Sequence, residues 1–127
     1  MPRVFADEQE NKIKTFIILA LDFNKTHNIF SRESYDEVYE NDILDCKPLI
    51  NHIKKNESVL DLGSGGGFPG ILVSITRPEN KISLLERNNK KCYFFTFQAF
   101  KKYGHQPSIK LWTYFQHEST VYQPQLL

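Results

Sequence analysis

Cysteine is scarce in this sequence, with only Cys46 and Cys92 among 127 residues. The two cysteines form no Cys-x-x-Cys pair and lie in no cluster with histidines, which argues against a zinc site and a disulfide scaffold. Long apolar runs are also missing. The longest, residues 16–21, falls far short of the ~20 residues that cross a bilayer. The first twelve residues lack the apolar core of a secretory signal. We therefore expect a cytoplasmic protein with no membrane attachment and no metal.

Neither sign of charge dominates, because 16 basic and 15 acidic residues give a net charge of +1. This balance identifies no partner, since a nucleic-acid-binding protein is recognised by basic residues gathered on one face. Hydrophobic residues make up 40% and charged residues 24% of the chain, which is typical of a soluble globular protein and excludes a disordered one. The length suits a single domain.

Glycine is nearly absent outside one segment, since five of the six glycines fall within residues 63–70. The segment "VLDLGSGGGFPG" begins with a short apolar strand, and "PGILVSI" then predicts a helix that opens at Pro69. A second strand is predicted at residues 81–86, a helix at 88–104 and a third strand at 108–112. The alternation of strand and helix is typical of a parallel sheet with right-handed crossovers. It predicts the first half of a doubly wound, Rossmann-like α/β fold.

Helices are predicted before this sheet. One apolar face has the spacing of a helix: Ile13, Phe16, Ile17, Ala20 and Leu21. Residues 24–28 predict a turn. Ser31 or Ser34 could cap a second helical segment that reaches about residue 53, with a kink or a break at Pro48. We expect a helical N-terminal cap at 1–55 and a partial Rossmann-like region at 56–127, together forming one domain.

The fifteen residues after Trp112 are too few for several more strands and helices. Three parallel strands would also leave the last strand with an open edge, which exposes unpaired backbone groups. We therefore expect a chain that is truncated after its third strand.

The glycines lie between a strand and a helix, where an open parallel sheet binds ligands. Gly63, Gly65 and Gly67 allow the backbone to turn tightly and to approach a ligand that side chains would hold away. Asp61 stands two residues before the first glycine, and Glu86 closes the second strand. The positions of these two acids relative to the glycines favour S-adenosylmethionine (SAM) over a dinucleotide as the ligand.

Alternatives remain at these positions. Gly65 and Gly70 also satisfy a shifted dinucleotide motif, and a tight turn without a ligand is a further alternative. Asp61 could hydrogen-bond the amides of the turn instead of the ligand. Glu86 could be a charge at the end of a strand, although its spacing favours ligand contact.

Several segments resemble one family. "VLDLGSGGGFPGILVSI" and "ISLLERNNKKCYFF" are similar to the RsmG (GidB) family of 16S ribosomal RNA guanine-N7 methyltransferases. Upstream, "FNKTHNIFS" resembles the family's W-N-x-x-x-N-L-x-S pattern, with Phe23 in the aromatic place. "ENDILDCKPL" resembles its H-I-x-D-S-L segment, with Asp42 where histidine is usual and Cys46 in the serine place. The resemblance spans about residues 16 to 118, and Phe68-Pro69-Gly70 is its most specific feature.

The resemblance implies SAM as cofactor, 16S ribosomal RNA or the small ribosomal subunit as partner, and a monomer. It implies cofactor contacts at Gly63 and Phe68 within the glycine-rich turn that also holds Asp61, Gly65 and Gly67. It implies that Glu86 binds the ribose hydroxyls and that His117 and Glu118 meet the adenine. It assigns no catalytic residue.

The family's next motif, S-R-A on a fourth strand, would follow Leu127, so methylation could be lost in this chain. Other possibilities are a SAM methyltransferase with another substrate, a nucleotide-binding module without catalysis, and a non-catalytic remnant of a disrupted gene. Lys90 and Lys91 match the family's paired lysines and could approach RNA phosphates, or they could form a solvated helix start.

Overall fold

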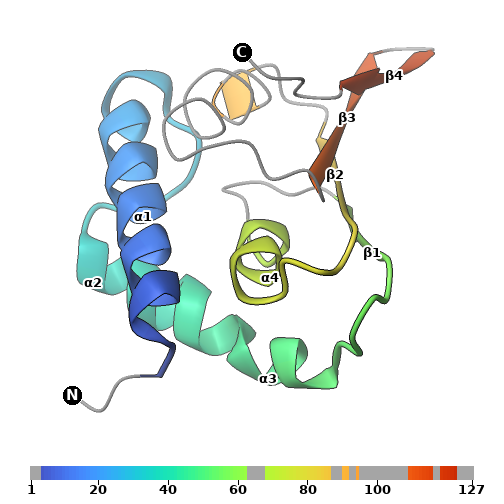
Figure 1. The fold of residues 1–127 in the computed structure, drawn as a ribbon. Helices are drawn as coiled ribbons and strands as arrows, with labels where there is room; N and C mark the ends of the chain where they lie inside the picture. Colours follow the sequence, from blue (N-terminus) through green and yellow to red (C-terminus); the bar gives the residue numbers. More distant parts are fainter. Residues whose placement is uncertain are drawn as a thin grey trace.

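The computed structural model describes residues 4–62, 68–86, 90–91, 94, 109–115 and 118–122, the last two ranges as backbone strands (Figure 1). The elements along the chain are α1 (Asp7–His27), α2 (Tyr35–Val38), the π-helical η1 (Tyr39–Leu44), α3 (Asp45–His52), β1 (Val59–Leu62), α4 (Gly70–Thr76), β2 (Ile82–Glu86), β3 (Ile109–Phe115) and β4 (Glu118–Tyr122). Helices followed by the first half of a Rossmann-like sheet were predicted, and this arrangement is confirmed. The predicted helix at 88–104 lies mostly outside the described residues.

The four strands form one sheet in the order β1-β2-β3-β4. β1 pairs with β2, and β2 pairs with β3, both in parallel, as the alternation of strands and helices predicts. In this register Asp61 lies opposite Leu84, and Glu86 lies opposite Thr113. Asp61 and Glu86 therefore share one face of the sheet, because alternate residues of a strand point to the same side.

The strand β4 was not predicted. The sequence suggests that the third strand ends at Trp112, whereas β3 continues to Phe115 and is followed by β4, which pairs with it in antiparallel orientation. Phe115 lies opposite Glu118, so the two strands form a hairpin that needs only a short connection. The hairpin pairs the edge of β3 that three parallel strands alone would leave open.

The first helix buries the predicted apolar face, with Ile13, Phe16, Ile17 and Ala20 in the core. It continues through the predicted turn at 24–28 and ends at His27, because Asn28 takes a left-handed conformation with a φ of 50°. The side chain of Asn24 explains the difference. Its Oδ1 accepts a hydrogen bond from the Phe30 N–H at 2.9 Å and its Nδ2 donates to the Arg32 carbonyl at 3.2 Å. Asn24 thus holds the loop that follows the helix while its own backbone stays helical.

The second helical segment begins at one of the two predicted caps. The Ser34 hydroxyl accepts a hydrogen bond from the Glu37 N–H at 3.2 Å. A kink or a break was predicted at Pro48. The helix instead widens into a π-helical turn that ends at Leu44, before the proline. Pro48 lacks the N–H that an α-helix would donate to the Leu44 carbonyl, and its ring crowds that carbonyl. The wider turn therefore precedes α3, which carries the proline inside it.

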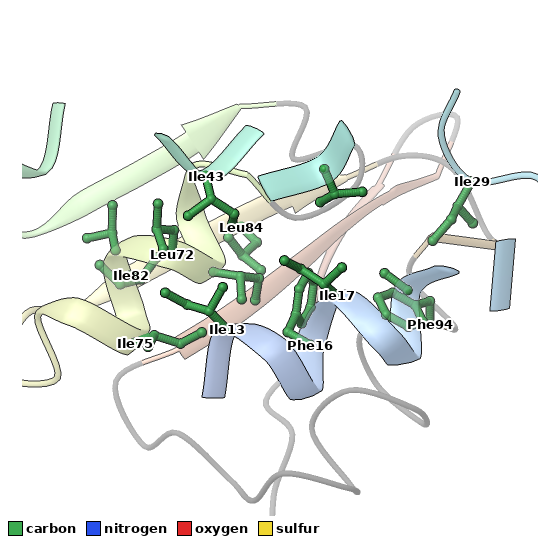
Figure 2. Close-up of a cluster of buried hydrophobic side chains, with 14 of the residues drawn as sticks. Ile13, Phe16, Ile17, Ile29, Ile43, Leu72, Ile75, Ile82, Leu84 and Phe94 are labelled. Atoms are coloured by element: carbon green, nitrogen blue, oxygen red, sulfur yellow. The ribbon is translucent and has the colours of Figure 1, made fainter. Parts of the chain in front are cut away.

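The core lies where α1 and α4 meet the inner face of the sheet (Figure 2). Figure 1 shows α4 between α1 and the strands, and α4 contacts α1, α3, β1 and β2. Every residue of α4 is buried. The side chains that converge in Figure 2 include Ile13, Phe16 and Ile17 of α1, Leu72 and Ile75 of α4, and Ile82 and Leu84 of β2. Within the described residues, no helix is both long enough and apolar enough to cross a membrane.

Candidate cofactor site at the carboxyl ends of the parallel strands

Asp61 joins the end of β1 to the start of α4. Its Oδ2 accepts a hydrogen bond from the Gly70 N–H at 2.9 Å, and the carboxyl group is buried. An amide in the first turn of a helix has no partner within the helix, and a carboxylate there also interacts favourably with the helix dipole. Asp61 therefore has a structural role at the end of the turn. Of the two roles that the sequence left open, the bond to a backbone amide is present, and ligand contact remains a prediction.

Gly70 lets the helix approach the sheet closely. A Cβ at this position would collide with Cδ2 of Leu84 and would lie 2.8 Å from Oδ2 of Asp61. A side chain here would therefore push α4 away from both strands and would strain the bond to Asp61. The last glycine of a phosphate-binding turn serves the same close packing of helix and strand in dinucleotide-binding folds.

Two buried acids lie on one face at the carboxyl ends of β1 and β2. Glu86 is the last residue of β2 and is 5% exposed. Burial raises the pKa of the Asp61 carboxyl; the hydrogen bond from Gly70 opposes that rise, and the charge of Glu86 adds to it. The two carboxyl groups are thus close enough to interact. A carboxylate at the end of the second strand can accept hydrogen bonds from a pair of hydroxyl groups, which is the donor set of a ribose.

Phe68 is half-buried at the end of the glycine-rich turn and packs against the core. Its ring makes an edge-to-face contact with Phe16 of α1, with 5.3 Å between ring centroids, and Phe16 also packs against Phe94 at 5.7 Å. Phe94 is fully buried. The peptide bond between Phe68 and Pro69 is cis. Phe68 is therefore held by the helical cap, and its contact with a cofactor remains a prediction.

The helical cap also approaches the site through α3. Cys46 is half-buried, and burial raises the pKa of its thiol, as do the charges of Asp42, Asp45 and Asp61 in that order. Asp42 forms a bidentate ion pair with Arg32. The Arg32 Nε lies 3.1 Å from Oδ2 of Asp42, and the Arg32 Nη2 lies 3.1 Å from Oδ1. The aspartate in the family's histidine place thus ties the loop after α1 to η1.

The other predicted cofactor contacts are placed only in part. Gly63, Gly65, Gly67 and His117 lie outside the described residues. Glu118 is the first residue of β4 and lies opposite the end of β3. Its backbone is therefore at the same edge of the sheet as the carboxyl ends of the parallel strands. Its contact with the adenine stays a prediction.

Sequence reasoning missed the roles of two residues, Gly70 at the site and Asn80 at the opposite, amino-terminal end of β2. Gly70 was considered only as part of a motif, although the spacing of the last glycine to the helix could have indicated close packing. Asn80 lies before β2 with its side chain fully buried, and its Nδ2 donates to the carbonyls of Lys54 at 2.7 Å and Glu57 at 2.8 Å. No local pattern marks this role, because its partners are far away in the sequence.

Comparison with known proteins places the sequence near one group of relatives. The family model for rRNA small subunit methyltransferase G matches residues 9–104. A protein of Ruthia magnifica subsp. Calyptogena magnifica named ribosomal RNA small subunit methyltransferase G is 37% identical over 90 residues, which cover 71% of this chain and 44% of that protein. The proteins of the same name from Pseudomonas paraeruginosa and Neisseria meningitidis serogroup B are each 33% identical over 89 residues, or 70% of this chain and 42% and 43% of theirs. The chain spans less than half the length of these relatives.

Proposed function

Because the chain belongs to the rRNA small subunit methyltransferase G family, we propose that it supplies the SAM-binding elements of an enzyme that methylates N7 of a guanine in 16S ribosomal RNA. The observation that carries the proposal is the family match over a region whose two buried acids, Asp61 and Glu86, share one face where parallel strands end. Ligands of open α/β sheets bind at that edge.

The residues around the turn fit the cofactor. The carboxylate of Glu86 would accept hydrogen bonds from the ribose hydroxyls, and Phe68 would pack against an apolar part of the ligand. Asp61 would keep the start of α4 against β1 through its bond to Gly70, so that the glycine-rich turn between them has fixed ends. Gly63, Gly65 and Gly67 would provide backbone amides, and His117 and Glu118 would meet the adenine. When bound, SAM supplies a methyl group that is activated by its sulfonium.

Methyl transfer to guanine N7 requires the protein mainly to position the reactants. Guanine N7 carries a lone pair at neutral pH, so no base has to remove a proton before attack. With SAM bound, the N7–carbon bond would form as the carbon–sulfur bond breaks, and the positive charge would pass from sulfur to the purine. Holding N7, the methyl carbon and sulfur in line is catalysis by orientation. The target guanine has to be unpaired or drawn out of its stack to reach the site.

Cofactor binding is tested by titrating the isotope-labelled 127-residue chain with SAM and following amide resonances, which detects even millimolar affinity. We expect shifts at Asp61, Phe68 and Glu86. Glu86→Gln should weaken SAM binding by roughly tenfold, because the two ribose hydroxyl donors lose a charged acceptor. Glu79→Gln is the matched control, since Glu79 is an exposed acid between α4 and β2. Absence of any shift at saturating SAM would overturn the cofactor assignment.

Methyl transfer is tested separately with labelled SAM and small ribosomal subunits from cells that lack this modification. Label at N7 of a guanine in 16S ribosomal RNA supports the proposed substrate. Label at another RNA position or on protein overturns the guanine assignment and leaves the cofactor assignment intact. Binding of SAM without any transfer restricts this chain to the cofactor-binding part of the activity.

A further inference from the structure

The imidazole of His27 lies flat on the ring of Phe23 in the last turn of α1. The two rings are nearly parallel, with an interplanar angle of 3° and 3.9 Å between their centroids. Thr26 holds one edge of the imidazole, because its Oγ1 lies 2.7 Å from Nδ1 of His27. The same hydroxyl donates to the Phe23 carbonyl at 3.3 Å, so Oγ1 accepts a hydrogen bond from the Nδ1–H. The ring is therefore fixed on one face and at one edge.

The other face and the Nε2 edge of His27 are not used by the fold that the structure describes. The side chain is half-buried, and no residue of the described ranges forms a hydrogen bond with Nε2. Since Phe23 covers one face and Thr26 covers the Nδ1 edge, the exposure falls on the remaining face and edge. A histidine that caps a helix would donate to its last carbonyls. His27 donates to a side chain instead, which leaves a fixed aromatic surface toward solvent.

His27 ends a row of aromatic rings that begins at the glycine-rich turn. Phe68 contacts Phe16 at 5.3 Å between centroids, Phe16 contacts Phe94 at 5.7 Å, and Phe94 contacts Phe23 at 5.2 Å. Figure 2 shows Phe16 and Phe94 beside α1. Phe16 and His27 are about 16 Å apart along the axis of this helix. In Figure 1 the last turns of α1 accordingly lie beyond the start of α4.

We propose that the free face of His27 stacks against a base of the RNA substrate, next to the target guanine in the strand. The ring is too far from the turn to reach the target guanine itself. A preformed aromatic surface accepts any base, since every base has a π-face, and a ring that is already ordered loses little freedom on binding. An enzyme that acts on an unpaired or extruded base also has to hold the adjacent strand. The inference rests on the proposed RNA substrate and is independent of SAM.

The test titrates the 127-residue chain, without SAM, into a single-stranded RNA of about ten nucleotides that carries 2-aminopurine, whose fluorescence falls when it stacks. His27→Ala should weaken RNA binding roughly tenfold and remove most of the quenching, because the stacking surface is lost. His27→Phe should keep both within about threefold, because it retains an aromatic face without the ring nitrogens. His52→Ala is the matched control, since it removes an exposed imidazole from α3.

Circular dichroism should be the same for the unmodified chain and all three variants, because both histidines are accessible to solvent and Phe23 keeps its contact with Phe94. Unchanged RNA affinity in His27→Ala would overturn the proposal. An equal loss in His27→Phe and His27→Ala would also overturn it, since the contact would then be polar, to a phosphate or a base edge. No RNA binding by the unmodified chain would overturn it as well. None of these outcomes bears on cofactor binding, which is measured by the amide shifts that SAM produces at Asp61 and Glu86.

Discussion

Gly70 shows how a single missing side chain sets the distance between a helix and a sheet. Gly70→Ala should destabilise the fold by about 1–3 kcal/mol, because the added Cβ would collide with Cδ2 of Leu84 and crowd Oδ2 of Asp61 at 2.8 Å. Urea denaturation measures this change. In a Leu84→Ala background the same substitution should cost less, by about 0.5 kcal/mol or more, because one colliding atom is gone. Additive effects of the two substitutions would contradict the close packing.

The buried carboxyl of Asp61 should make stability depend on pH. Burial, partly opposed by the Gly70 hydrogen bond and reinforced by Glu86, raises its pKa in the folded state above the ordinary 3.8. For a raised carboxyl pKa, the stabilisation that comes from protonation is complete below the ordinary pKa and is lost as the pH rises through the folded value. Asp61→Asn keeps an acceptor for the Gly70 N–H but never ionises. It should therefore be more stable than the unmodified chain at pH 7, with the difference shrinking toward pH 4.

Urea denaturation at both pH values measures this difference. Asp22→Asn is the control, because Asp22 is exposed on α1 and its charge is not buried. Equal stability of Asp61→Asn and the unmodified chain at pH 7 would show that burial does not penalise the charge. Glu86→Gln removes one cause of the raised pKa, so it should move the pH dependence toward lower pH.

At the scale of single elements, Asn80 ties the connection after α3 to the start of β2. Asn80→Ala should cost about 1–3 kcal/mol, because the carbonyls of Lys54 and Glu57 lose a buried donor. Both partners are carbonyls, which fixes the orientation of the amide, and Oδ1 has no hydrogen-bond partner among the described residues. Asn80→Asp should cost more, since it replaces the donor with a second acceptor. Thermal denaturation compares these variants with Asn51→Ala on the exposed side of α3, for which we expect less than about 0.5 kcal/mol.

Elements whose signals are local were predictable. The spacing of apolar residues identified the buried face of α1, and Ser34 was among the predicted caps, because each depends on neighbours within a few residues. The alternation of β1, α4 and β2 likewise follows from short apolar runs and turn residues. The position of Glu86 at the end of a strand follows from the same pattern, whereas its burial was not predicted.

Features that depend on distant partners were not predictable. The residue type of Asn24 predicts a turn. Its side chain instead forms hydrogen bonds with the backbone of residues 30 and 32, and α1 continues past it. The β4 strand depends on pairing with β3, and the role of Asn80 depends on carbonyls more than twenty residues away. The sequence predicts which acids and glycines belong to the site. The close approach of Gly70 to Leu84 is visible only in the packed structure.

At the scale of the whole molecule, Phe16 joins the helical cap to the sheet region. Its ring is buried against Phe68 and Phe94. Phe16→Ala should destabilise the fold by about 3–5 kcal/mol, because it leaves a cavity between the two parts. If residues 1–55 and 56–127 form one domain as we propose, circular dichroism and Trp112 fluorescence should report one shared unfolding transition, before and after the substitution. Two separate transitions would show independent units. Ile18→Ala, half-exposed on the same helix, should shift stability by less than about 0.5 kcal/mol.

The hydrogen bond between Asp61 and Gly70 also bears on the order of folding. Its acceptor and donor are nine residues apart, and a loop of that length closes in about 10–100 ns. The pairing of β2 with β3 joins residues such as Glu86 and Thr113, so it has to close a longer loop at a greater entropic cost. The ends of the glycine-rich turn can thus meet before the sheet that they serve has assembled. The carboxylate that anchors the turn is a contact of low sequence separation, available to the earliest steps of folding.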